Sequence, residues 1–482
     1  MPSYTYENLV SSMHCIAAAP PSGWKAEGVS TDTRTMDRGC LFFALSGDRF
    51  DAHNYLDEAV GRGASGIVIE KNKKESCLAF LNSIGPEICI FEVDDVLKSL
   101  QSLASWHRRR IAAPVIAVTG SSGKTSAKEM LLTLIESSGK KAGGTTGNLN
   151  NHIGLPLTLA NLDEDCDYIV LEMGMNHPGE ISLLSRIARP DLSLITSVSG
   201  AHIGFFNSVE EILSAKLEIT EGMDENGLLV YCASSGMQEQ VSRYAENHKI
   251  RCLQYALIEK ISADRMPDEY GENLQTDLNG IQFSWRRNTI KNSNYFSREM
   301  AENLLGCMIV MEKAGMKFPS ILENAQRARP LTEGRFQVFR KLNSSGNLSI
   351  LIDDSYNANG DSFCKAISAL RRILPEGKLL LISGEMAELG NFSETEHARV
   401  GIQAGLEKYD LVIASGSENA TTLLDACSME HPDGRTLLAE NREEIIRDLK
   451  QHLKGMDGIL VKGSRSAGMD LVCQAIKEMG YV

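Results

Sequence analysis

The sequence contains no apolar run that approaches the ~18 residues of a membrane span. Its first residues, Met-Pro-Ser-Tyr-Thr-Tyr-Glu, lack the basic stretch and apolar core of a signal peptide, and we expect none. The 11 cysteines form no Cys-x-x-Cys pair, which predicts reduced thiols in a cytoplasmic protein. A net charge of −14 argues against a nucleic-acid-binding surface. It leaves an anionic substrate possible, because local basic residues set the field of a site.

The composition and the spacing of apolar runs indicate an α/β protein. Hydrophobic residues make up 43% of the 482 residues and charged residues 23%, as in ordinary globular proteins. Short apolar runs alternate with helical patterns, which is typical of parallel sheets covered on both faces. These runs lie at residues 41–45, 66–69, 88–93, 115–118, 168–171, 193–196, 228–231, 349–352, 378–382, 411–413 and 459–461. The polar stretch 259–294 looks instead like antiparallel hairpins or loops.

Two changes along the chain predict domain boundaries. The basic run Trp106-His-Arg-Arg-Arg110 precedes an apolar strand, and a helical pattern ends near Arg327-Ala-Arg-Pro-Leu331. We therefore predict three domains, in keeping with the chain length. They are a smaller N-terminal α/β domain at residues 1–110, a central domain with a mostly parallel P-loop-type sheet at 111–329, and a doubly wound, Rossmann-like domain at 330–482. No internal repeat or low-complexity tract is present.

The segment Val115-Ile-Ala-Val-Thr-Gly-Ser-Ser-Gly-Lys-Thr125 predicts a phosphate-binding loop. A β-branched run leads through two glycines into a helical pattern, so backbone N–H groups and the positive helix end point at one spot. Lys124 can neutralise phosphate oxygens there, and the Thr125 hydroxyl can bind Mg²⁺. The general pattern has glycine where Val118 stands, so this loop is a shorter variant. We predict ATP chemistry.

Three further polar residues follow apolar runs or lie on an apolar face. Glu172 closes the strand at residues 168–171, where open α/β sheets bind ligands, and is either a metal ligand or a capping carboxylate. His202 follows the strand at residues 193–196 and is either part of the same site or an ordinary loop residue. Lys216 lies on the apolar face of a helical pattern. Burial would lower its pKa and permit carbamylation by CO₂, whereas a snorkelling lysine would pair with Glu218 or water.

Polar loops elsewhere supply further candidate contacts. Residues 145–156 are rich in amides and glycine, which suits a polar substrate, although an ordinary turn before a helix would read the same way. Residues 352–359 and 462–465 follow strands, and the first of these loops offers carboxylates for a ribose and a tyrosine for a base. Arg335 lies near a domain boundary and could reach phosphates. Each loop alone fits a surface turn, but together they suggest a domain that closes over a nucleotide.

In combination these motifs resemble the Mur ligase family over nearly the whole chain. Thr119-Gly-Ser-Ser-Gly-Lys-Thr125 is similar to the family's ATP loop, and Glu172, His202 and Lys216 stand at its metal and carbamate positions. Further motifs are similar to the members that act on UDP-N-acetylmuramoyl-tripeptide and D-alanyl-D-alanine. They are Asp32-Thr-Arg34, the run 41–53, Thr146-Gly-Asn-x-Asn-Asn151, Asp354-Ser-Tyr-Asn-Ala-Asn359, Gly384-Glu-Met-Ala-Glu-Leu-Gly390 and Lys462-Gly-Ser-Arg465.

This resemblance implies an ATP-dependent, ADP-forming amide ligase that makes an acyl phosphate and acts as a cytoplasmic monomer. The catalytic residues would be Lys124, His202 and Lys216. The ATP-binding residues would be Gly120, Ser121, Ser122, Gly123, Lys124, Thr125, Asn303, Arg335, Asp354, Tyr356 and Asn357. Two Mg²⁺ ions would be held by Thr125, Glu172, His202 and carbamylated Lys216. Substrate would contact Thr33, Arg34, Ser46, Thr146, Asn148, Asn150 and Asn151.

The chain departs from the family pattern at several positions. Ser197 stands where asparagine is usual, and the usual His-Asn pair ahead of Asn303 is Glu299 and Met300 here. Gly360 replaces a usual proline, and Ala52 replaces a usual glycine. None of these changes removes a phosphate or metal residue, so we expect a divergent but active enzyme.

Three alternative functions differ from this one in their expected sequence features. A sister ligase that adds one amino acid typically carries an Asp-(Asn/Asp)-Pro-Arg motif. This chain lacks that motif, and Pro432-Asp-Gly-Arg435 resembles it only superficially. A folylpolyglutamate synthetase-like ligase would lack the N-terminal UDP-domain pattern. A non-catalytic nucleotide-binding partner would have no need to retain the lysines and acidic groups named above.

Overall fold

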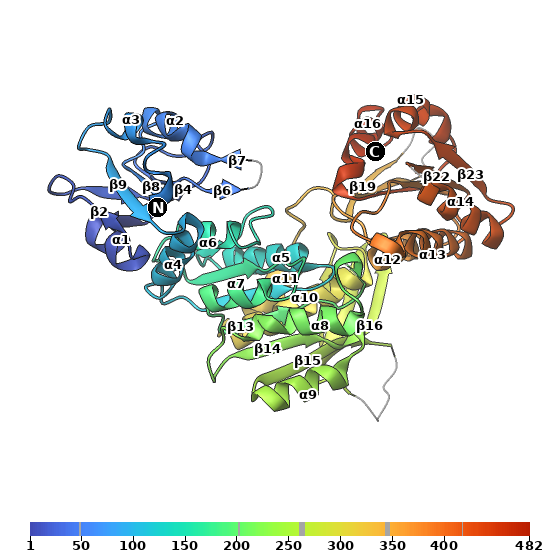
Figure 1. Ribbon diagram of the computed structural model, residues 1–482. Coiled ribbons are helices and arrows are strands. Elements are labelled where there is room, and N and C mark those ends of the chain that lie inside the picture. The colour runs from blue at the N-terminus through green and yellow to red at the C-terminus, as the bar shows by residue number, and fades with distance from the viewer. Residues whose placement is uncertain (48–49, 201–202, 260–265, 343–347, 417) are drawn as a thin grey trace. The chain divides into compact units, whose positions relative to one another are not determined.

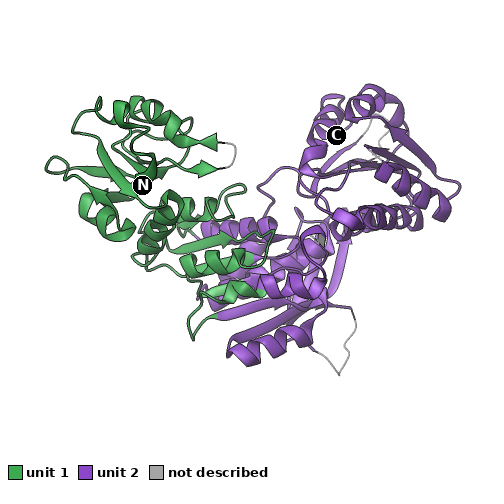
Figure 2. Ribbon diagram, in the orientation of Figure 1, with its two compact units in different colours: residues 1–118, 139–193, 217–227 green, residues 119–138, 194–216, 228–482 purple. Residues whose placement is uncertain are grey.

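A computed structural model describes residues 1–47, 50–200, 203–259, 266–342, 348–416 and 418–482. The chain divides into two compact units (Figure 2). Unit 1 comprises residues 1–118, 139–193 and 217–227, and unit 2 comprises residues 119–138, 194–216 and 228–482. The fold is α/β with mostly parallel sheets, as the sequence predicts. No helix in the described ranges is long and apolar enough to cross a membrane.

The N-terminal part of unit 1 is built on a five-stranded sheet in the order β2-β9-β8-β5-β4. Strands β4, β5, β8 and β9 pair in parallel, and helices lie in the connections from β5 to β8 and from β8 to β9 because parallel neighbours need crossover connections. The strands are β2 (Ile16–Ala17), β4 (Val29–Ser30), β5 (Leu41–Phe43), β8 (Gly66–Glu70) and β9 (Cys89–Val93). The helices are α1 (Tyr6–Met13), α2 (Leu56–Gly61), α3 (Leu78–Leu81) and α4 (Val96–Arg108). Two short pairs accompany them, β1 (Ser3–Thr5) with β3 (Lys25–Glu27), and β6 (Ser46–Gly47) with β7 (Phe50–Asp51).

The largest sheet has nine strands in the order β11-β12-β10-β13-β14-β15-β16-β17-β18. Of these strands, β13, β14, β15 and β16 are labelled in Figure 1. Strands β10, β11, β12, β14 and β15 pair in parallel, whereas β16, β17 and β18 form an antiparallel meander. The first strands are β10 (Val115–Thr119), β11 (Ala142–Gly144), β12 (Tyr168–Glu172), β13 (Leu192–Ile195) and β14 (Leu228–Cys232). The remaining strands are β15 (Arg251–Ile258), β16 (Glu269–Asp277), β17 (Gly280–Trp285) and β18 (Asn288–Asn292). The described part of residues 259–294 is thus the antiparallel material that the sequence predicts.

Helices of the central region follow the strands that they connect. Their bounds are α5 (Lys124–Ser137), α6 (Gly154–Leu159), α7 (Glu180–Ala188), α8 (Val209–Leu217), α9 (Gln238–His248), α10 (Arg298–Lys313) and α11 (Phe318–Arg327). Helix α10 is buried along most of its length, which explains why its sequence, unlike that of a surface helix, is apolar nearly all round.

The C-terminal part of unit 2 has a six-stranded sheet in the order β19-β20-β24-β21-β22-β23. Only β19 is antiparallel, and β24 returns between β20 and β21, so the region is doubly wound. The strands are β19 (Gln337–Leu342), β20 (Leu348–Asp354), β21 (Leu379–Ser383), β22 (Leu411–Ser415), β23 (Arg435–Ala439) and β24 (Gly458–Lys462). The helices are α12 (Gly360–Ile373), α13 (Ser393–Leu406), α14 (Glu418–Glu430), α15 (Arg442–His452) and α16 (Asp470–Glu478).

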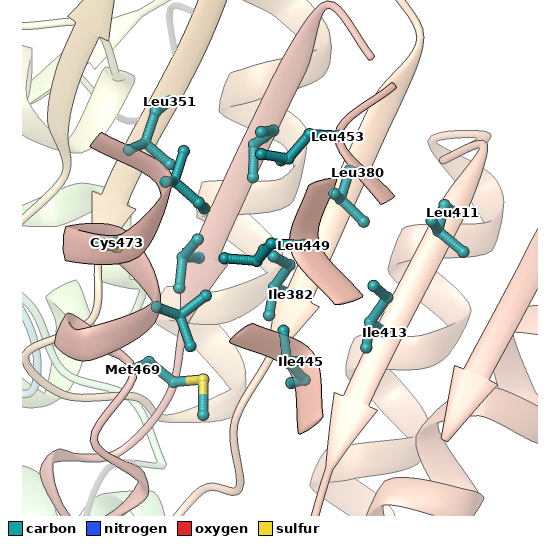
Figure 3. Close-up of a cluster of buried hydrophobic side chains, with 14 of the residues drawn as sticks. Leu351, Leu380, Ile382, Leu411, Ile413, Ile445, Leu449, Leu453, Met469 and Cys473 are labelled. Carbon is teal, nitrogen blue, oxygen red and sulfur yellow. The ribbon is translucent and has the colours of Figure 1, made fainter. Parts of the chain in front are cut away.

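The core of this C-terminal region lies between its sheet and helices α15 and α16. Leu380, Ile382 and Ile413 project from the strands toward Ile445 and Leu449 of α15 (Figure 3). Burial of each such side chain contributes ~1.5–3 kcal/mol to stability. This packing fixes the strand ends, and the loops that follow β20, β21 and β24 start from a rigid base.

A buried histidine lies within unit 1 where α4 approaches residues 160–162. His107 is 1% exposed, its Nε2 donates a 2.8 Å hydrogen bond to the Leu162 carbonyl, and its Nδ1 has no partner among the described residues. Tyr4 packs its ring edge against the imidazole and donates a 2.6 Å hydrogen bond to the Ala160 carbonyl. Burial lowers the pKa of His107, so the imidazole stays neutral in the folded chain.

Acid should destabilise the protein partly through His107. Near and below the ordinary histidine pKa of ~6.5, the unfolded chain binds a proton at this position more readily than the folded chain does. The free energy of unfolding therefore decreases as the pH falls. We expect the free energy of unfolding to fall by up to ~1 kcal/mol more in the wild type than in His107→Gln between about pH 7.5 and about pH 5.5. The glutamine amide can still donate to Leu162 but does not titrate. Urea unfolding at the two pH values measures the free energy of unfolding of each protein. Equal losses in the wild type and in His107→Gln would contradict the prediction.

Candidate active site

The loop from residues 119 to 124 joins β10 to α5. All of β10 is buried, and Gly123 caps α5 with a left-handed backbone at φ +82°. Lys124 Nζ donates a 2.7 Å hydrogen bond to the Gly120 carbonyl, so the ammonium folds back over the loop. Thr125, at the start of the helix, is 5% exposed. Strand, tight turn and helix therefore follow in the order that a phosphate-binding loop requires.

The loop is supported from one side by the segment that follows β13. Thr196 Oγ1 donates a 2.6 Å hydrogen bond to the Ser122 carbonyl, and the Ser122 N–H donates a 2.9 Å hydrogen bond to Ser197 Oγ. A Cβ atom at Gly120 would lie 2.1 Å from Thr196 Oγ1, so only glycine fits there. Ser197 is a departure from the family pattern, and its hydroxyl acts here as a direct support of the loop.

Lys216 lies on α8 and is 1% exposed, without an ion-pair partner in the described part of the chain. Burial, followed by the nearby charge of Lys124, holds the pKa of the Lys216 ammonium well below its usual range. The snorkelling alternative is wrong, because the side chain does not reach solvent. Glu218, its suggested partner, instead accepts hydrogen bonds of 2.7 and 3.1 Å from the backbone N–H groups of Gly179 and Ser182. His202 lies outside the described residues.

Glu172 ends β12 and is 2% exposed, beside Val118 of β10 in the strand register. Asn150 Nδ2 donates a 2.8 Å hydrogen bond to Glu172 Oε1, and the Glu172 N–H donates to Thr145 Oγ1 at 2.9 Å. Glu172 Oε2 is buried and has no hydrogen-bond partner among the described residues. A buried carboxylate oxygen without a donor is costly, and the donor set suits a cation. Glu172 therefore fits the predicted role of a metal ligand.

The amide-rich loop divides into residues with structural contacts and exposed ones. Asn150 orients Glu172, as described above, and Asn151 Oδ1 accepts hydrogen bonds of 3.1 and 2.8 Å from the N–H groups of Ile153 and Gly154 at the start of α6. Thr146 and Asn148 are exposed. These last two side chains are the ones open to a substrate.

Asn303 of α10 lies directly over the phosphate loop. It is 6% exposed, and a Cβ atom at Gly123 would lie 2.6 Å from Asn303 Nδ2. Of the two departures ahead of it, Met300 is buried in the core, whereas Glu299 is partly exposed. The structure thus brings Asn303 to the loop at which the sequence predicts ATP.

The predicted site residues of the C-terminal region lie near the C-terminal end of β20. Asp354 Oδ2 forms a 2.5 Å ion pair with Lys462 Nζ, and its Oδ1 accepts a 3.0 Å hydrogen bond from the Phe336 N–H. The guanidinium carbon of Arg335 lies 4.1 Å from the centre of the Tyr356 ring, a cation–π contact. The Asn357 side chain turns back, and its Oδ1 accepts from the Ala358 N–H at 2.9 Å.

The predicted substrate residues of the N-terminal region lie in unit 1. Thr33 is 7% exposed, whereas Arg34 is exposed and pairs with Asp32 at 2.6 Å. Ser46 Oγ donates a 3.0 Å hydrogen bond to Asp51 Oδ1. Arg34 and Ser46 are therefore open to ligand, and Thr33 supports the loop behind them.

Two residues that the sequence analysis left outside the site belong to this region of unit 2. Lys462 is 2% exposed and binds both Asp354 and, at 3.0 Å, the Asn357 carbonyl. Asn359 caps α12, and its Nδ2 lies 3.4 Å from Ser122 Oγ of the phosphate loop. Lys462 ends β24 and Asn359 lies in the loop after β20, and these strand-end positions were signals that could have identified both residues.

Fold and site define a nucleotide-dependent α/β enzyme with a phosphate loop, and similarity to known proteins gives its family. The family models described as "Mur ligase middle domain" and "Mur ligase, glutamate ligase domain" match residues 118–311 and 334–465. The chain is 31% identical over 458 residues to the UDP-N-acetylmuramoyl-tripeptide–D-alanyl-D-alanine ligase of Escherichia coli (strain K12), with 94% of each chain covered. The chain belongs to the Mur ligase family.

Solved structures agree with this assignment. Crystal structure I of MurF from Acinetobacter baumannii superposes with a TM-score of 0.84 at 25% identity, covering 99% of each chain. MurF ligase from Thermotoga maritima in complex with ADP superposes with a TM-score of 0.77 at 26% identity, covering 94% of this chain and 97% of that one. This chain is an ATP-dependent, ADP-forming ligase.

Proposed function

We infer that the enzyme joins D-alanyl-D-alanine to UDP-N-acetylmuramoyl-tripeptide and so makes the UDP-pentapeptide precursor of peptidoglycan. The observation that carries this inference is similarity along nearly the whole chain to ligases named for that reaction. The sister ligase that adds a single amino acid and the non-catalytic partner are not supported in the same way. We further propose a monomeric enzyme of the cytoplasm.

The chemistry runs in two balanced steps. The terminal carboxylate of the tripeptide attacks the γ-phosphorus of ATP, which forms an acyl phosphate and releases ADP. The amino group of D-alanyl-D-alanine then attacks the acyl carbon, loses a proton and displaces inorganic phosphate, which leaves an amide. A carboxylate is a poor electrophile, and phosphorylation gives it a good leaving group. The enzyme must also bring two anions together, so cationic groups have to offset their repulsion.

The phosphate loop and Lys124 would hold the transferred phosphoryl group. The ammonium of Lys124 can leave the Gly120 carbonyl for phosphate oxygens. We propose that Arg335 approaches the same group from the C-terminal side. Asp354 would bind the ribose, and Tyr356, Asn357 and Asn303 would line the nucleotide. Exclusion of water would protect the acyl phosphate from hydrolysis.

Magnesium is proposed at two positions. Thr125 and Glu172 would hold one ion, and the partnerless Glu172 Oε2 supports that role. His202 and carbamylated Lys216 would hold the second. The neutral amine of buried Lys216 would add to CO₂ and lose a proton, and the resulting carbamate is an anion suited to Mg²⁺. When bound, the ions neutralise charge on the phosphates.

The UDP-linked substrate is proposed to bind between polar loops of unit 1. Arg34 is a charged donor for the diphosphate, and Thr33 and Ser46 would add hydroxyl contacts. The exposed Thr146 and Asn148 would contact the peptide, with Asn150 and Asn151 shaping that loop.

Phosphate release tests the proposed reaction. With ATP and UDP-N-acetylmuramoyl-tripeptide, we expect release to depend on D-alanyl-D-alanine and to yield a UDP-pentapeptide by mass. Omission of either substrate is the control. Release with a single amino acid in place of the dipeptide would assign the chain to a sister ligase, and no release with any combination would contradict the proposal.

A further inference from the structure

Glu129 is a buried carboxylate on the phosphate-loop helix α5 that the proposed reaction leaves without a role. It is 7% exposed, and the hydrogen bonds described for its carboxylate come from Leu331 and Thr332. Glu129 Oε2 accepts from the N–H groups of Thr332 at 2.9 Å and Leu331 at 3.3 Å, and the Thr332 hydroxyl donates to Oε1. A buried charge is expensive, so these bonds are what makes it tolerable.

The segment that Glu129 holds connects α11 to β19 and carries Arg335. At its far end, the Tyr356 N–H donates a 2.9 Å hydrogen bond to the Gly334 carbonyl. Gly334 has φ +70°, and a Cβ atom there would lie 3.0 Å from Ser355 Oγ. The connecting segment is therefore fixed at both ends, to α5 by Glu129 and to the loop after β20 by Gly334.

Arg335 directly follows Gly334, the second attachment point, and has a hydrogen-bond donor that no described residue uses. Its guanidinium stacks on Tyr356, but its buried Nε has no hydrogen-bond partner in the described part of the chain. A small cavity lined by Glu129, Tyr295 and Arg335 lies beside it, and the Tyr295 hydroxyl is likewise without a partner among the described residues. Arg335 is thus held in place by its neighbours more than by its own hydrogen bonds.

We propose that Glu129 is a positioning residue that clasps residues 331–332 to the phosphate-loop helix and thereby sets the place of Arg335. The clasp links the helix that begins at Lys124 to the segment that delivers Arg335, so the two cations keep a fixed spacing. This rests on the proposed function, in which both meet the transferred phosphoryl group. A displaced cation would stabilise the transition state less well, with little effect on ATP binding.

Steady-state kinetics of five proteins test the clasp: wild type, Glu129→Ala, Arg335→Ala, the double variant and Glu129→Gln. We expect Glu129→Ala to lower kcat ~10- to 100-fold while KM for ATP changes less than about threefold. The double variant should be no slower than Arg335→Ala, because Glu129 acts through Arg335. Glu129→Gln should recover much of the activity, since its amide can accept from the N–H groups and donate to the Thr332 hydroxyl.

A matched control is Glu136→Ala, which removes an exposed carboxylate from the same helix and should leave kcat unchanged. Fully multiplicative losses in the double variant, or unchanged kcat in Glu129→Ala with an intact fold by circular dichroism, would overturn the proposal.

Limited trypsin digestion separates the clasp from the reaction itself. Arg327 is an exposed cleavage site at the end of α11, close to the clasped segment, and Arg329 is protected by the proline that follows it. Cleavage at Arg327 should be several-fold faster in Glu129→Ala than in wild type or Glu136→Ala. This readout needs no turnover, so it stands even if the ligase reaction fails. Equal cleavage rates in all three proteins would overturn the clasp.

Discussion

Replacing Lys124 by alanine should abolish ligation while the fold survives. The ammonium is the charged donor nearest to the loop N–H groups, and its loss leaves developing charge on the phosphoryl oxygens uncompensated. We expect kcat to fall by at least ~100-fold, the cost of removing one preorganised donor in comparable sites. The loss of the hydrogen bond to the Gly120 carbonyl should lower stability by ~1 kcal/mol.

Phosphate release and thermal unfolding of the same preparation measure both effects. Lys140→Ala is a suitable control, since it removes an exposed lysine paired with Asp167 at 3.0 Å. That variant should retain full activity. Normal turnover in Lys124→Ala would contradict the proposed role of the phosphate loop in the reaction.

The second large effect is expected at Lys216. Lys216→Ala should lose nearly all activity, because the proposed carbamate on this side chain would be the anion that binds the second Mg²⁺. Formate, acetate or propionate should restore part of the rate, since a small carboxylate can occupy the space left by the side chain and replace the carbamate. The shortened side chain leaves a cavity, so unfolding measurements must accompany the kinetics.

Rescue by small amines provides the opposing test for Lys216. If the residue acted as a cation, methylammonium would restore activity and carboxylates would not. Carboxylate rescue without amine rescue is the result that carbamylation predicts. Labelling with ¹³C-bicarbonate offers a direct view, since the wild type should carry one labelled carbamate that Lys216→Ala lacks.

Much of the fold was predictable because its strands are locally distinctive. Each of the apolar runs named from the sequence is a strand, since buried parallel strands need continuous apolar residues on both faces. Two of the strands that were missed lack this pattern. Strand β11 is Ala-Gly-Gly, and β23 is an edge strand with Leu437 and Leu438 exposed. Pairing with a neighbour, and not intrinsic preference, makes these segments strands.

The site was predictable where its chemistry is encoded in consecutive residues or in helical spacing. The phosphate loop is of the first kind. Lys216 is of the second, and its burial agrees with the apolar face on which the sequence places it. Glu129 and Ser197 act through partners that are distant in sequence, so no local pattern shows what they contact. Lys462 follows a predicted strand and stands in a family motif, but its partner Asp354 is 108 positions away and only the fold brings the two together.

The most direct test of the account uses tripeptide substrate labelled with ¹⁸O in its terminal carboxylate. If that carboxylate attacks ATP and the dipeptide displaces phosphate, one ¹⁸O atom must appear in inorganic phosphate and the other must remain in the new amide. We predict this transfer in equal amounts with pentapeptide formation. Unlabelled phosphate alongside pentapeptide would contradict the acyl phosphate, and therefore the central claim that this enzyme activates the peptide carboxylate with ATP.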